Sequence, residues 1–131
     1  MKTLEDIQDH MEMLENIGTI KKRGSPPVLD YERMAIILSA SPKKHEEGKS
    51  FDKHFMEGFY NALGWVMETP KKEWEIKEAY KLVDDSIMEI MDMTGKKKGH
   101  KINMVKRHRL IGERNAYGFC LDWSTTPQSR R

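Results

Sequence analysis

The sequence of 131 residues contains a single cysteine, Cys120, and lacks any long apolar run. One cysteine excludes an internal disulfide and a zinc site built from several cysteines. The longest apolar run, 34–38, is far shorter than the ~20 residues of a membrane-spanning helix. The first residues also lack the apolar segment of a signal peptide. These absences predict a protein of the cytoplasm, a reducing compartment, without a membrane partner.

Catalytic motifs are absent as well: there is no glycine-rich phosphate loop, no G-x-S-x-G and no H-E-x-x-H. The best metal-ligand pattern is His54 with Glu57 at helical spacing, and a protein metal site needs further donors. We therefore expect no catalytic residue, no metal and no cofactor, and we favour a non-enzymatic protein.

The spacing of apolar residues up to residue 93 predicts a mainly α-helical protein. Thr3 is the expected N-cap of the first helix, and Thr69-Pro70 is the expected start of the last. Gly58 and Gly64 lie inside a predicted helix, where small residues allow another helix to approach closely. The expected body has four helices, at 3–20, 29–40, 51–68 and 70–93.

Two shorter stretches complete this picture. The apolar run 34–38 is expected to form a central buried helix, although such a run also suits a strand. Residues 41–50 contain no large apolar side chain and are expected to form an exposed loop.

The pattern changes after Gly95. Apolar residues alternate with small or polar ones over 117–123, which predicts a strand, whereas 102–111 suits either a strand or a basic helix. The expected organisation is a helical domain, 1–95, with a basic C-terminal segment, 96–124, packed on it. That segment would carry one short strand or a small β-hairpin, and 125–131 would form a loose tail.

The charge distribution is uneven. Residues 1–93 hold 13 basic and 19 acidic side chains, a net charge of −6, whereas 94–131 hold 10 and 2, a net charge of +8. Such a basic block predicts phosphate contacts with DNA or RNA, either by a helix in a groove or by a hairpin whose aromatic residues stack on bases. Its alternative role is to pair with the acidic body. The candidate nucleic-acid-binding residues are Lys96, Lys97, Lys98, Lys101, Lys106, Arg107, Arg109 and Arg114.

The first predicted helix carries a narrow apolar seam at spacings of three and four residues. The seam either packs on the domain's own core or binds a partner helix, including a second copy of the chain. The second possibility predicts a protein-binding adaptor or inhibitor of a larger complex, which would act through this helix or through the basic segment against an acidic partner surface. Its candidate partner-binding residues are Leu4, Ile7, Met11 and Leu14. The small size and charge pattern suit an accessory or regulatory protein such as viruses and phages encode.

Two carboxylate steps lie on the last predicted helix, Glu75–Glu78 and Glu89–Asp92. This ExxE and ExxD pattern resembles that of the MazG-type nucleotide pyrophosphohydrolases, which are all-helical and magnesium-dependent. The resemblance implies a helical hydrolase that uses Mg²⁺. In that family the two steps lie on two antiparallel helices. Here one helix carries both, and its rise puts them ~16 Å apart. A hydrolase is therefore the remote alternative to a non-enzymatic protein.

Overall fold

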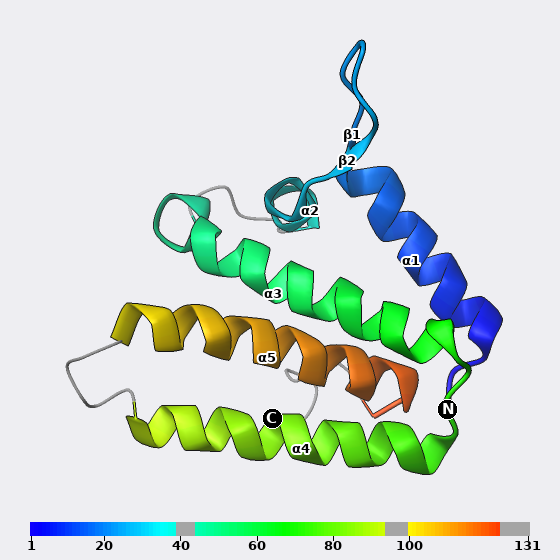
Figure 1. The fold of residues 1–131 in the computed structure, drawn as a ribbon, viewed down its shortest axis with the longest axis vertical. Coiled ribbons are helices and arrows are strands. Elements are labelled where there is room, and N and C mark those ends of the chain that lie inside the picture. Colours follow the sequence, from blue (N-terminus) through cyan, green and yellow to red (C-terminus); the bar gives the residue numbers. More distant parts are fainter. Residues whose placement is uncertain (39–43, 94–99, 124–131) are drawn as a thin grey trace.

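The computed structural model describes residues 1–38, 44–93 and 100–123, with side chains described over 1–38, 53–90 and 104–123. As predicted, the protein is mainly helical, and a small antiparallel sheet joins its first two helices (Figure 1). The elements in chain order are α1 (Leu4–Gly18), β1 (Thr19–Ile20), β2 (Val28–Leu29), α2 (Tyr31–Leu38), α3 (Lys44–Glu68), α4 (Glu73–Met93) and α5 (His100–Cys120).

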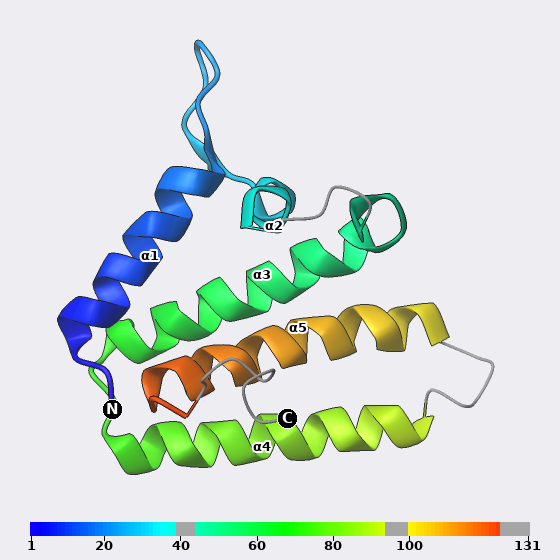
Figure 2. The same cartoon turned by 180° about the vertical axis from the view of Figure 1, so that it is seen from behind.

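The three long helices lie side by side, with α5 between α3 and α4 (Figures 1 and 2). On the other side of α3, α1 and α2 pack against it, and the β1–β2 hairpin projects away from the helices. The core fills the space between these elements. Its largest fully buried side chains are Ile7, Leu14, Met34, Leu63, Val66, Ile76 and Cys120.

The closest helix contact joins α3 to α5. A Cβ atom added to Gly58 would lie 2.0 Å from the carbonyl oxygen of Arg109, and one added to Gly112 would lie 2.0 Å from that of Phe55. The two backbones therefore touch where each helix has no side chain. The predicted close approach is confirmed at Gly58 but not at Gly64, where an added Cβ would lie 3.9 Å from Met11 Cε.

The expected C-terminal strand is wrong, because residues 100–120 form the fifth helix. The alternation of apolar and polar residues over 117–123 is also compatible with one buried face of a helix. Ala116, Tyr117, Cys120 and Leu121 carry the buried apolar side chains there, and positions i, i+1, i+4 and i+5 share one face of a helix. The only strands among the described residues are β1 and β2, so the small β-hairpin lies near the N-terminus instead.

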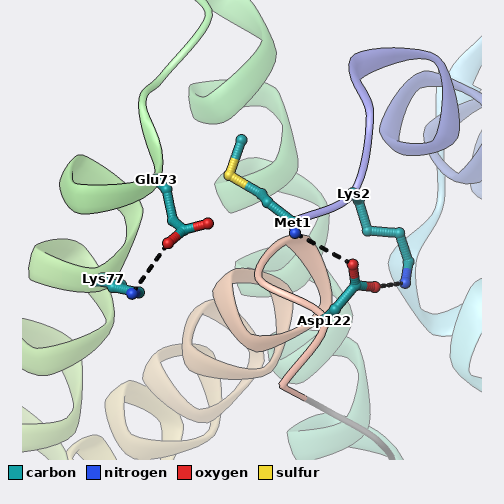
Figure 3. A network of polar contacts seen from close by, with 5 residues as sticks. All are labelled: Met1, Lys2, Glu73, Lys77 and Asp122. Carbon is teal, nitrogen blue, oxygen red and sulfur yellow. Dashed lines mark hydrogen bonds and ion pairs between the residues drawn. The ribbon is translucent and has the colours of Figure 1, made fainter.

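A Schellman motif ends α5. The Trp123 amide donates to the Gly118 carbonyl (2.9 Å), the Asp122 amide donates to the Phe119 carbonyl (3.1 Å), and Asp122 has a φ of 60°. Beside this cap the Lys2 amide donates to the Cys120 carbonyl at 2.7 Å. Figure 3 shows the Asp122 carboxylate between the Lys2 ammonium and the Met1 amino group, with the neighbouring Glu73–Lys77 pair of α4. These contacts fix the start of the chain to the end of α5.

The predicted starts of the two long helices also need correction. Residues 44–50, expected in a loop, begin α3, whereas 41–43 lie outside the described residues. Thr69 and Pro70 form a turn, and α4 begins at Glu73. The Lys72 carbonyl accepts the amides of Glu75 (3.0 Å) and Ile76 (3.2 Å), so the first helical hydrogen bonds form three residues after the predicted cap.

The apolar run in α2 is less buried than expected. Met34 and Ala35 are buried, but Ile36, Ile37 and Leu38 are 45%, 49% and 46% exposed. The helix is short and lies across α3 at the edge of the molecule, so only one of its faces reaches the core. Within the described ranges, none of the helices has the length and apolarity needed to cross a bilayer.

Candidate nucleic-acid interface

The structure places four of the predicted nucleic-acid-binding side chains, all on α5: Lys106, Arg107, Arg109 and Arg114. Lys101 belongs to the first turn of α5, but its side chain lies outside the described set, as do residues 96–98 entirely. The ambiguous stretch 102–111 is helical.

Two of these cations face different neighbours and form ion pairs with the acidic body. Arg109 contacts Glu57 of α3, with Nε 3.2 Å and Nη2 3.1 Å from Oε1. Arg114 contacts Asp84 of α4, with Nη1 2.7 Å from Oδ1. Pairing with the body, the alternative role of the basic block, therefore accounts for part of its charge.

The other two cations form no ion pair among the described residues. Lys106 is exposed and borders a small cavity of about 220 Å³ beside Ser86 and Glu89 of α4. Arg107 is half-buried, and its Nε has no hydrogen-bond partner. Arg109 and Arg114 are five residues apart and therefore differ by about 140° around α5, so the basic side chains do not all point to one neighbour.

The hairpin is a second basic element. Lys21, Lys22 and Arg23 follow β1 and are all exposed. The Ser25 amide donates to the Lys22 carbonyl at 3.0 Å, and Gly24 closes this turn with a φ of 81°, which favours glycine. The sequence pattern places these cations just after the end of the first predicted helix, where they suit its dipole, and it did not identify them as a site. The signal was three consecutive cations before Gly-Ser-Pro-Pro, with no carboxylate over 16–29.

A cavity of about 650 Å³ lies between the hairpin, the start of α2, α3 and α5. Three cations from three elements border it, Lys22 of the hairpin, Lys53 of α3 and Arg109 of α5. Apolar hairpin residues form another part of its wall. The remaining charged or ring-bearing residues of the lining are Asp30, Tyr31, Glu32, His54 and Glu57.

Several groups in this wall already have partners within the fold. Asp30 Oδ1 accepts the Arg33 amide at 3.1 Å and so caps α2, and Glu57 pairs with Arg109. Burial, and then the nearby Glu57 carboxylate, raise the pKa of Tyr31, so its phenol stays neutral. His54 Nδ1 is buried without a hydrogen bond, and the closest Glu57 oxygen is 3.6 Å away. An unsatisfied buried polar atom is uncommon in a folded protein.

The seam of the first helix is largely inside the protein. Ile7 and Leu14 are fully buried, Met11 is 9% exposed, and Leu4 is 40% exposed. The first three join the common core with α2, α3 and α5. This burial favours the interpretation of the seam as internal packing, and a partner-binding role for it stays a prediction.

The carboxylates of α4 lie on one unbroken helix, as the resemblance argument expected. Across the described ranges, no three or more His, Cys, Asp or Glu side chains are grouped so that they could hold a metal ion. The hydrolase alternative therefore gains no support from this helix.

No protein-family model, no curated protein and no solved structure matches the chain. Its function must therefore be inferred from its own residues and their geometry.

Proposed function

We propose that this protein is a non-enzymatic accessory or regulatory protein that binds nucleic acid. The contact surface combines Arg109 of the basic C-terminal segment with the cations of the hairpin and of α3. The observation that carries this proposal is the arrangement of Lys22, Lys53 and Arg109 around one cavity. Three elements far apart in the sequence thereby place cations around the same space, together with three carboxylates. The adjacent exposed Lys21 and Arg23 make the surface as a whole positively charged.

Phosphate binding is the chemistry that suits this surface. Lysine and arginine side chains neutralise phosphates and release bound counterions, which makes the affinity strongly salt-dependent. The ion pair with Glu57 leaves Arg109 able to take part, because a guanidinium has five N–H donors and Glu57 engages only its Nε and Nη2 groups. The Arg109 side chain is 42% exposed, so its remaining donors can reach a ligand.

The test is fluorescence anisotropy with a short DNA duplex and with single-stranded RNA across a salt series. Replacement of Lys21, Lys22 and Arg23 by alanine should weaken binding. It should also reduce the slope of log affinity against log salt by about 2 to 3, because each lost phosphate contact contributes ~0.9. Binding that is unaffected by this triple change, or absent at low salt, would refute the proposal.

A matched control changes the net charge by the same amount elsewhere. Lys72, Lys77 and Lys81 are exposed cations at and near the start of α4, away from the hairpin (Figure 1). Their replacement by alanine should leave the salt slope nearly unchanged. An equal effect of both triple variants would mean that the overall charge, rather than the hairpin surface, attracts the nucleic acid.

A protein-binding adaptor is the second candidate, and exposed apolar side chains on α4 favour it. Trp74 and Leu82 are 61% and 64% exposed and border a groove of about 300 Å³ with Trp65 of α3. Large exposed aromatic residues are typical of protein interfaces. If the groove joins copies of the chain, light scattering should give an oligomer that the Trp74→Ala/Leu82→Ala variant converts to a monomer. A monomeric wild-type protein would exclude self-association through this groove.

A further inference from the structure

The cavity beneath the hairpin has the size and lining of a small-molecule site. Its volume of about 650 Å³ lies within the ~300–1,000 Å³ typical of ligand pockets. Such pockets combine an apolar wall with a few convergent polar groups. Here Ile20, Pro26, Val28 and Leu29 give the hairpin side an apolar surface. The charged groups of the lining come from the hairpin and from the helices: Lys22, Asp30, Glu32, Lys53, Glu57 and Arg109.

The charges around this cavity are balanced. Lys22, Lys53 and Arg109 contribute three positive charges. Asp30, Glu32 and Glu57 contribute three negative charges. A simple anion would be expected at a site with excess positive charge, and a cation at a site with excess negative charge. The balance favours a ligand that carries both an anionic group and hydrogen-bond donors.

We propose that this cavity binds one nucleotide, either free or as an unpaired residue of a nucleic-acid strand. The phosphate would lie among Lys22, Lys53 and Arg109. The base would lie against the apolar hairpin wall and the Tyr31 ring, with its amino groups facing the carboxylates. The strand form of this inference rests on the proposed nucleic-acid binding, whereas the free-nucleotide form does not.

Two features of the wall support this assignment. The Tyr31 phenol stays neutral, so its ring offers an uncharged face on which a base can stack. The Tyr31 ring is also held in place, because its centroid lies 6.1 Å from that of Tyr60, and the Tyr60 hydroxyl donates to Glu15 of α1. The His54 side chain also borders the cavity and adds an imidazole ring to this wall.

The preference for an unpaired nucleotide follows from the lining of the cavity. Residues of the hairpin, α2, α3 and α5 all border it, so a base that contacts the Tyr31 ring would have protein on several sides. We expect an unpaired base to reach this contact more readily than a base stacked and paired within a duplex. A single strand or an overhang should therefore bind more tightly than a blunt duplex.

The direct test is isothermal titration calorimetry of the full chain with adenosine 5′-monophosphate. Adenosine and inorganic phosphate serve as half-ligands. We expect saturable one-to-one binding of the nucleotide and much weaker binding of either half, because the two halves of the cavity recognise different parts. Tyr31→Ala should weaken nucleotide binding by at least about fivefold, the lower limit for the loss of one stacking contact. Lys72→Ala, outside the cavity, should have no effect.

A second variant guards against loss of the fold in Tyr31→Ala. Val28 is 60% exposed at the cavity wall, so Val28→Glu should preserve the fold, which circular dichroism would verify. The new carboxylate would replace apolar surface on the wall that the base is proposed to contact, so it should also weaken nucleotide binding. Normal nucleotide affinity in a folded Val28→Glu protein would overturn the proposed binding mode.

Anisotropy with a single strand, a duplex with an overhang and a blunt duplex separates the two sources of the ligand. A preference for unpaired strands that is lost in Tyr31→Ala supports the strand form. Binding of the mononucleotide without binding of any strand supports the free form and refutes the proposed function. Equal binding of all three nucleic acids, unaffected by Tyr31→Ala and without mononucleotide binding, overturns this inference while the proposed function stands. No binding of any of these probes refutes both.

Discussion

Alanine at Gly58 or Gly112 should destabilise the protein, although each glycine lies inside a helix. Alanine has the higher helix propensity, so in an isolated helix either change would stabilise by up to ~1 kcal/mol. In this fold the opposite is expected, because each new Cβ would lie 2.0 Å from a carbonyl oxygen of the facing helix. The outcome depends on which effect is larger.

The magnitude follows from the geometry of the contact. An ordinary contact of a Cβ atom begins at about 3.4 Å, so α3 and α5 must separate by ~1 Å or more. Such overpacking costs ~1–3 kcal/mol, and the upper end applies here because a backbone carbonyl cannot rotate away as a side chain can. After subtraction of the propensity gain, a loss of about 2 kcal/mol remains. For a chain of 131 residues this lowers Tm by roughly 8 °C.

The control for this prediction is Gly64→Ala on the same helix. An alanine Cβ there would lie 3.9 Å from Met11 Cε, an ordinary contact, so the propensity gain should raise Tm by up to roughly 4 °C. Thermal unfolding followed by circular dichroism measures all three variants. A Tm increase in Gly58→Ala or Gly112→Ala would refute the close backbone contact of α3 and α5.

Three further predictions concern groups around α5. Burial raises the pKa of Glu113 in the fold, so its contribution to stability is complete below the unfolded value near 4.5 and is lost as the pH rises through the folded value. Glu113→Gln should thus raise Tm at pH ~7 but not at pH ~4, and an equal Tm difference at both would contradict this. Cys120 is fully buried, and burial raises its pKa to about 12. A thiol reagent should therefore label only the unfolded protein, and fast labelling of the native protein would contradict this expectation. Asp122→Ala should lower Tm more than Asp122→Asn. Both variants lose the ion pair with Lys2, but asparagine tolerates the positive φ better than alanine does. Equal Tm values would show that the positive φ at this position does not reduce the stability of the alanine variant.

Sequence patterns predicted the helices best where a helix carries its own signals. The Thr3 hydroxyl accepts the Asp6 amide at 3.1 Å and begins α1 as expected. Thr69-Pro70 carried an equally good signal, yet these two residues form a turn. Lys71, which follows them, donates to the carbonyls of Trp65 and Thr69. A short connection between two antiparallel helices thus took precedence over the local preference for a helix start. That preference is worth only ~1 kcal/mol, which tertiary contacts readily exceed.

The misassigned C-terminal strand has a related cause. Alternation over a few residues is shorter than two turns of a helix, so it cannot distinguish a period of two from the paired positions of a buried helical face. The packing of this segment against α3 determines that it forms a helix. Gly112 allows α5 to lie directly on α3, and the buried positions 116, 117, 120 and 121 then continue that contact.

The candidate site was less predictable than the fold because charge along a sequence and charge in space are different quantities. The basic block predicted one cationic surface. Five residues of a helix correspond to a rotation of about 140°, however, so Arg109 faces α3 and Arg114 faces α4. The hairpin, in contrast, brings together cations that are far apart in the sequence, because it places Lys22 at the cavity that Arg109 borders. Without the hairpin, the described lining of this cavity would hold Lys53 and Arg109 as its cations, with Arg109 paired to Glu57. The hairpin adds Lys22, so three cations surround one space in which a phosphate could bind.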